Sequence, residues 1–143
     1  MKTLVDSCVW SLLLRRKDSS ALSGDEQQIV MSLRNAIQDG RVAIIGPIRQ
    51  EVLSGIKDSI QFEKLRRSLE SFTDEPLSTP LYEDAARLFN LCRSRGVECG
   101  RVDMLICAVA ALKHWAILTN DGGLKRCIDV LRTEGVIRSV SRS

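Results

Sequence analysis

The chain has 143 residues, of which 44% are hydrophobic and 27% charged, and its formal net charge is +3. This length is enough for one domain that buries a core without help from metals or disulfides, and the composition excludes disordered and fibrous classes. The mild positive charge permits an anionic partner such as nucleic acid but does not require one.

Short apolar runs alternate with segments whose apolar residues recur at helical spacing. In chain order we expect a strand at 2–6, a helix at 7–15, a helix capped by Asp25 and ended by Gly40, a strand at 41–46, helices at 47–56, 59–71 and 81–95, a helix from Asp103, a strand at 114–119, and a helix or turn from Asp121. The pattern also allows a short strand within 74–80 and a last edge strand at 135–140.

Strands separated by helices favour parallel pairing with right-handed crossovers. The expected fold is therefore a three-layer α/β/α domain with a central, mostly parallel sheet, and no linker or repeat divides residues 1–143. In such a sheet the functional crevice lies beyond the carboxyl ends of the strands. Asp6 and Asp121 come directly after two of these strands, so both should face that crevice.

Five cysteines, Cys8, Cys92, Cys99, Cys107 and Cys127, are scattered without any CxxC pair. This usage indicates a reduced, cytosolic protein without a structural zinc ion. The longest apolar run, residues 104–112, is shorter than the roughly 20 residues that a membrane span needs. We expect no membrane association and a cytoplasmic location.

Four carboxylates stand out from the other acidic residues. Asp6, Asp103 and Asp121 precede helical sequence, where Asp is a preferred N-cap, so each alone has an ordinary structural explanation. Glu51 lies a full turn inside the helix that Pro47 opens, which is too deep for a cap. Taken alone, Glu51 is explained equally well as a solvated charge at the border of the apolar face.

The four residues together carry more weight than each one does alone. Acids at strand ends and helix starts of one sheet converge at the same edge, and two carboxylates about 5 Å apart repel by ~3 kcal/mol at an effective dielectric constant near 20. Protons or a cation must offset such repulsion. Mg²⁺ and Mn²⁺ choose oxygen ligands, and sites of this kind activate water and bind phosphoryl oxygens.

Four segments, "LVDSCVW", "GPIRQEVLSGI", "VDMLICAVAAL" and "LTND", resemble the successive motifs of PIN-domain ribonucleases, specifically the VapC toxins of bacterial toxin–antitoxin pairs. The resemblance runs nearly end to end. It implies a single PIN domain and an Mg²⁺- or Mn²⁺-dependent endoribonuclease in which activated water attacks an RNA phosphodiester and leaves a 5′-phosphate. The resemblance implies that the metal ligands and catalytic residues are Asp6, Glu51, Asp103 and Asp121, and that Ser7 and Thr119 support them by hydrogen bonds.

One departure concerns the last motif, which family members often continue as TxDxDF. Here "TNDGGLKR" keeps Asp121 but has Gly123 and Leu124 in the final two places, so the ligand set for a second metal ion is incomplete. Asn120 is either a neutral oxygen ligand or an exposed turn residue.

The resemblance also implies three partners: an RNA substrate, a small VapB-type antitoxin whose C-terminal segment covers the acidic crevice, and a second copy of the chain in a homodimer. Basic residues near the expected crevice could bind RNA phosphates. These are Arg15, Arg16, Lys17, Lys125 and Arg126. Their other interpretation is a solvated charged face.

Other functions fit the sequence less closely. A PIN-like module that has lost cleavage and only binds RNA or protein remains open because of the altered "NDGGL" end. A metal-dependent phosphatase of the haloacid-dehalogenase kind needs a second Asp two residues after Asp6, where this chain has Cys8. Only one histidine, His114, is present, which argues against Ser-His-Asp and Cys-His catalysis.

Overall fold

The computed structural model describes residues 1–15 and 21–138, and within them a small parallel sheet forms the centre of the fold. Its strands are β1 (Thr3–Val5), β2 (Val42–Ala43) and β3 (Ala116–Leu118), in the order β2-β1-β3. Thr3 aligns with Val42 on one side and with Ala116 on the other, and both pairings are parallel. The prediction of a parallel central sheet is confirmed.

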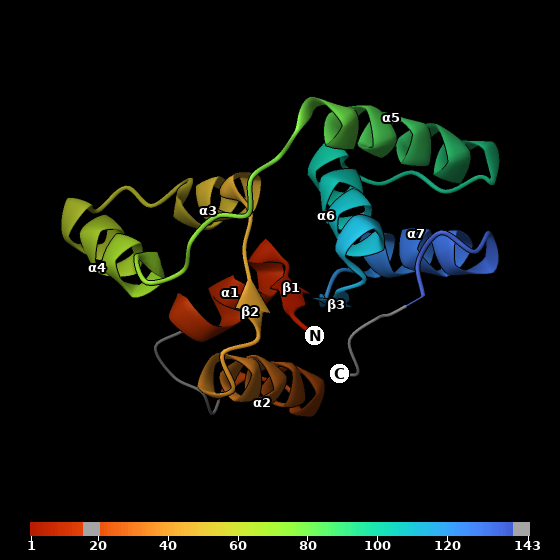
Figure 1. Cartoon of the computed structure of the whole chain (residues 1–143). Coiled ribbons are helices and arrows are strands. Elements are labelled where there is room, and N and C mark those ends of the chain that lie inside the picture. The colour runs from red at the N-terminus through yellow and green to blue at the C-terminus, as the bar shows by residue number, and fades with distance from the viewer. Residues whose placement is uncertain (16–20, 139–143) are drawn as a thin grey trace.

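Seven helices within the described residues surround this sheet. They are α1 (Ser7–Leu14), α2 (Gly24–Gln38), α3 (Gly46–Leu53), α4 (Ser59–Leu69), α5 (Thr79–Ser94), α6 (Arg101–Lys113) and α7 (Gly122–Thr133). Figure 1 shows the strands in the middle of the molecule, with α1 to α4 on one side of the view and α5 to α7 on the other. The predicted three-layer α/β/α arrangement is therefore confirmed.

The helix α6 is apolar on nearly all faces because it lies inside the molecule. Every residue from Met104 to Ala110 is buried, and the helix packs against α5 and β3. Burial of a side chain the size of Leu105 or Ile106 stabilises the fold by about 2 kcal/mol. The first turn of α6 is held firmly as a result, and Asp103 lies in that turn.

Several predicted boundaries are wrong by a few residues. Asp25 does not cap α2: Ser23 is the N-cap, and its hydroxyl accepts from the Glu26 N–H while Glu26 accepts from the Ser23 N–H. This reciprocal pair satisfies two helix N–H groups, which a cap at Asp25 would leave open. Asp103 is likewise not an N-cap but the third residue of α6, whose N-cap is Gly100.

The two extra strands allowed by the sequence do not form in the described residues. Near 74–80 the chain makes only one isolated bridge, between Ile44 and Asp74. After α7, Gly135 has a φ of +78°, and the N–H groups of Val136 and Ile137 turn back to the Leu131 carbonyl. These N–H groups close the helix end and cannot extend the sheet. The remainder of the expected 135–140 strand lies outside the described residues.

The structure contains a disulfide, which differs from the reduced protein that the scattered cysteines led us to expect. Cys99, in the loop before α6, forms a disulfide with Cys127 of α7, and their Cα atoms lie 6.9 Å apart. Cys8, Cys92 and Cys107 are free. The bonded pair is 28 residues apart in the sequence, so no local spacing motif reveals it. Among residues 1–15 and 21–138, no helix is long and apolar enough to cross a membrane.

Candidate active site

Two of the four carboxylates lie at the carboxyl edge of the sheet, as their strand-end positions predict. Asp6 directly follows β1 and caps α1, while Asp121 lies three residues after the end of β3 and caps α7. The parallel register pairs Val5 with Leu118, and the Asp6 N–H donates to the Leu118 carbonyl at 2.9 Å. Both acids therefore reach the same crevice from neighbouring strands.

Asp6 is the most firmly held of the four acids and is only 4% exposed. Its Oδ1 accepts from the Ser7 N–H at 2.8 Å, and its Oδ2 accepts from the Thr119 hydroxyl at 2.8 Å. The Thr119 oxygen in turn accepts from the Asp121 N–H at 3.0 Å. Thr119 therefore links the two strand-end acids, which is the supporting position expected for it.

Cys8 also contacts Asp6, and nothing in the sequence pointed to this residue as part of the site. Its thiol donates to Asp6 Oδ2 at 3.4 Å, and its sulfur accepts from the Asn120 N–H at 3.4 Å. Burial, and then the negative charge of Asp6, raise the pKa of the Cys8 thiol to about 11. The sulfur is thus a neutral thiol at pH 7. Asn120 itself is exposed, and its backbone rather than its side chain makes this contact.

Asp103 faces the other acids from the first turn of α6. Its Oδ2 accepts from the Gly100 N–H at 3.0 Å, which fixes the side chain toward the start of the helix. Burial raises the pKa of this carboxyl to about 6, and the charges of Asp6, Asp121 and Glu51 add to the rise while the Gly100 N–H opposes it. The other three carboxylates are therefore near enough to Asp103 to disfavour its ionised form.

Glu51 approaches the crevice from α3, where it is exposed and lines an open cavity. That cavity, of about 480 Å³, is bordered by Ser7, Pro47, Gln50, Glu51, Ser54 and Val102. Partial burial raises the pKa of Glu51, a hydrogen bond from the Ser7 side chain opposes the rise, and the charge of Asp6 adds to it. The Ser7 side chain therefore supports Glu51, whereas its backbone N–H supports Asp6.

The four acids form a loose group rather than a closed cage. In residues 1–15 and 21–138, no three His, Cys, Asp or Glu side chains converge closely enough to hold one metal ion as they stand. The type of donor nevertheless fits a hard divalent cation, because all four offer carboxylate oxygens, and the charges of the other three add to the rise that burial causes in the pKa of Asp103. The crevice is a concentration of negative charge open on the side of Glu51.

Two of the predicted basic residues lie beside the site, and one does not. Lys125 and Arg126 lie in the first turns of α7 after Asp121, whereas Arg15 follows α1 at the end opposite Asp6; all three are exposed. A Cβ atom placed on Gly122 would be 3.5 Å from Arg126 Nη1, so the glycine gives this guanidinium room beside the helix start. Arg16 and Lys17 lie outside the described residues.

Comparison with known proteins agrees with this geometry. The sequence model of the family described as PIN domain matches residues 3–128. The crystal structure of FitAcB from Neisseria gonorrhoeae is similar over 98% of this chain and 96% of that chain, with a TM-score of 0.70 and 18% sequence identity. At that identity the likeness concerns the fold. No curated protein sequence matches the chain.

Proposed function

Because the chain belongs to the PIN-domain family, we propose that it is a metal-dependent endoribonuclease and the toxin of a cytoplasmic toxin–antitoxin pair. The observation that carries the proposal is the convergence of charge at Asp103, where burial first and then carboxylates from three other parts of the fold raise its pKa. Four carboxylates brought together from distant parts of the chain repel one another, and a bound cation would offset this repulsion in addition to the helix-capping roles of Asp6 and Asp121.

In this proposal Asp6, Glu51, Asp103 and Asp121 hold Mg²⁺ or Mn²⁺. Such an ion, when bound, supplies an activated water and offsets the charge that develops on the phosphate. The chain's own contribution is orientation. Thr119 and the Ser7 N–H hold Asp6, and Gly100 holds Asp103, so that one oxygen of Asp103 is left free toward the crevice.

The remaining proposed role is the binding of RNA. In this proposal Lys125 and Arg126, exposed in the first turns of α7, bind phosphates next to the bond that is cut, and Arg15, exposed at the far end of α1, binds a phosphate further along the RNA. Trp10 takes no part in base stacking because it is 1% exposed and packs against Phe72 in the core.

A panel of three substrates tests the reaction class. The purified chain, freed from any antitoxin, is incubated in Mn²⁺ with a single-stranded RNA, a DNA of the same sequence and p-nitrophenyl phosphate. We expect RNA alone to be cut, with 5′-phosphate ends. Hydrolysis of the phosphomonoester would favour a phosphatase instead, and RNA binding without any cleavage would favour a non-catalytic module.

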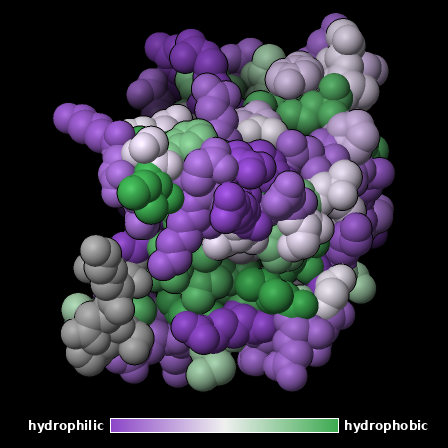
Figure 2. All heavy atoms as spheres, turned by 90° about the vertical axis from the view of Figure 1, so that its left-hand side faces the viewer, coloured by the Kyte–Doolittle hydropathy of each residue, from purple (hydrophilic) through white to green (hydrophobic). Residues whose placement is uncertain are grey.

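We propose that the antitoxin binds over the face that carries α1, α2 and α4. Figure 2 shows a strip of hydrophobic surface on this side, bordered by hydrophilic side chains. Met31 of α2 and Ile60 of α4 are large apolar side chains that are 57% and 79% exposed. A partner that covers apolar surface here could extend one segment into the acidic crevice between α3 and α6.

A second copy of the chain is the partner proposed for the opposite side. A mainly apolar cavity of about 510 Å³ lies between α5 and α6, and its lining includes Tyr82, Phe89, Met104 and Leu105. Tyr82 is 50% exposed, and the Arg101 guanidinium lies 5.8 Å from the Phe89 ring centre. Exposed aromatic residues beside an arginine are typical of interfaces between proteins.

Replacement of Ala86 by arginine is expected to convert the antitoxin-free dimer into a monomer. Ala86 is exposed and borders this cavity, so the new charge should not disturb the fold but would be buried without a partner in the dimer. Light scattering at micromolar concentration measures the change, with Ser68→Arg on α4 as a control that stays dimeric. A wild-type chain that is already monomeric would contradict the proposed dimer.

A further inference from the structure

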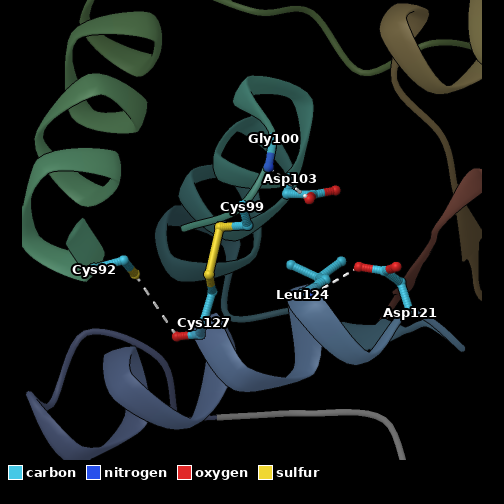
Figure 3. Close-up of a disulfide and its surroundings, with 7 residues drawn as sticks. All are labelled: Cys92, Cys99, Gly100, Asp103, Asp121, Leu124 and Cys127. Atoms are coloured by element: carbon cyan, nitrogen blue, oxygen red, sulfur yellow. Dashed lines mark hydrogen bonds between the residues drawn. A yellow bond between two sulfur atoms is a disulfide. The ribbon is translucent and has the colours of Figure 1, made fainter. Parts of the chain in front are cut away.

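The disulfide between Cys99 and Cys127 lies close to two residues of the proposed active site (Figure 3). Cys99 immediately precedes Gly100, whose N–H donates to Asp103 Oδ2 at 3.0 Å. Cys127 lies in α7, one turn after Leu124, whose N–H donates to Asp121 Oδ2 at 2.8 Å. The bond therefore connects the two backbone segments that orient Asp103 and Asp121.

The two ends of the bond differ in how firmly they are held without it. Cys127 is fully buried in α7, next to Leu124 and Ile128 of the core. Cys99 is partly exposed and belongs to the loop between α5 and α6, where Val97 N–H donates to the Cys92 carbonyl at 3.0 Å. Loss of the covalent bond would thus leave Cys127 in place and release the loop that carries Gly100.

We propose that this disulfide is a redox switch that holds the start of α6, and Asp103 with it, against α7. The oxidised chain presents Asp103 to the crevice in a fixed orientation. The reduced chain frees the 96–100 loop, weakens the Gly100 to Asp103 hydrogen bond, and binds the divalent cation less tightly. The metal part of this inference rests on the function proposed above, whereas the effect on the loop does not.

The exchange reaction needs an external dithiol of the thioredoxin or dithiothreitol class. One thiolate of the reductant attacks Cys99 Sγ, the more exposed sulfur, the bond to Cys127 breaks, and Cys127 leaves as a thiolate that takes up a proton. The second thiol of the reductant then displaces Cys99, which is protonated, and the reductant becomes a disulfide. Two electrons and two protons pass to the chain.

This assignment also fits the compartment proposed for the protein. Disulfides in a reducing cytoplasm are usually transient and serve redox sensing. The reduced form would then be the resting state, and oxidation would increase metal binding. A buried structural crosslink would require the opposite, a bond that persists under reducing conditions.

Peptide mapping establishes the bond first. Trypsin should release residues 96–101 linked to residues 127–132 from protein equilibrated with oxidised glutathione, and the two peptides should separate after reduction. Cys92, whose thiol donates to the Cys127 carbonyl at 3.9 Å, is a neighbouring third cysteine. A bond from Cys92 to Cys127, or five free thiols in the oxidised sample, would overturn the proposal.

Hydrogen exchange and calorimetry measure the consequence. Reduction should speed exchange of the backbone amides in 96–104 by about tenfold or more, and should weaken Mn²⁺ binding by about five- to tenfold. Dithiothreitol is removed under nitrogen before the Mn²⁺ titration because thiols bind the metal. Cys99→Ser should match the reduced chain under both conditions, and Glu98→Ser in the same loop should keep the redox response.

Exchange and Mn²⁺ affinity that are equal in the oxidised and reduced chains would refute the switch. If neither form binds Mn²⁺ while the exchange still responds to reduction, the proposed metal site is wrong and the control of the loop by the disulfide stands. The two failures can therefore be told apart.

Discussion

Replacement of Asp103 by asparagine is expected to reduce RNA cleavage by roughly 10³-fold, about 4 kcal/mol of the activation barrier, while making the metal-free protein more stable. Asparagine can still accept the Gly100 N–H, so the first turn of α6 should be unchanged. Activity falls because a neutral amide oxygen is a weaker ligand for Mg²⁺ or Mn²⁺ than a carboxylate. Asp129→Asn, on the exposed side of α7, serves as the control that keeps full activity.

The gain in stability follows from the pKa of Asp103. The folded-state pKa of about 6 lies above the value of 3.8 for an isolated side chain, so the folded protein binds this proton more tightly than the unfolded chain does. The wild type therefore loses stability as the pH rises from about 4 to about 6, and bears the full penalty above that range. Two pKa units correspond to ~3 kcal/mol, which solvent screening of this partly exposed group reduces to about 1–2 kcal/mol.

Urea unfolding of wild type and Asp103→Asn at several pH values in EDTA measures this effect. The variant should be more stable at pH 7.5, and the two curves should meet near pH 4. Excess Mn²⁺ should then stabilise the wild type but not the variant, because only the wild type binds it. Equal stabilities at every pH would show that burial and the charges of the other three acids do not raise the pKa of Asp103.

Two substitutions of Asp6 are expected to separate its contribution to RNA cleavage from its contribution to the stability of the fold. Asp6→Ala removes the cap of α1 and the acceptor of the buried Thr119 hydroxyl, which should cost about 2–4 kcal/mol of unfolding free energy as well as activity. Asp6→Asn keeps one oxygen for the Ser7 N–H and offers an amide group to Thr119. It should stay within about 1–2 kcal/mol of wild type and still lose roughly 10³-fold in cleavage rate.

The matched control for Asp6 is another capping aspartate far from the crevice. Asp58 caps α4 by accepting the Ile60 N–H at 3.1 Å and is exposed, so Asp58→Asn should cleave RNA at the wild-type rate. Thermal unfolding and initial rates on one RNA give both quantities. An Asp6→Asn chain that cleaves as fast as Asp58→Asn would mean that Asp6 is only a helix cap.

The features of the fold that follow from long apolar patterns were predictable. The runs of apolar residues in the strands and in α6 are compatible with few structures other than buried ones. The parallel pairing of the strands follows from the helices that separate them in the sequence. Helix starts were harder, because Ser23 and Asp25 are both good caps and only the reciprocal bond with Glu26 selects Ser23. The end of the chain was predicted wrongly because the N–H groups after Gly135 close α7.

The location of Asp6 and Asp121 could be derived from the ends of parallel strands. The position of Glu51 could not, since it depends on how α3 packs against α1, and its assignment as a metal ligand came from the family resemblance. The contacts of Cys8 and the bond between Cys99 and Cys127 join residues far apart in the chain, and no local spacing signals them. The looseness of the acidic group depends on side-chain positions that only the structure describes.

The most direct test of the account is the dependence of RNA cleavage on Mn²⁺, measured on one RNA with wild type, Asp6→Asn, Asp103→Asn and Asp58→Asn. We expect wild type and Asp58→Asn to show saturable activation by Mn²⁺ that EDTA abolishes, and the other two variants to remain inactive at every concentration. Cleavage that persists in EDTA, or equal rates for all four proteins, would contradict a metal-dependent nuclease at this crevice.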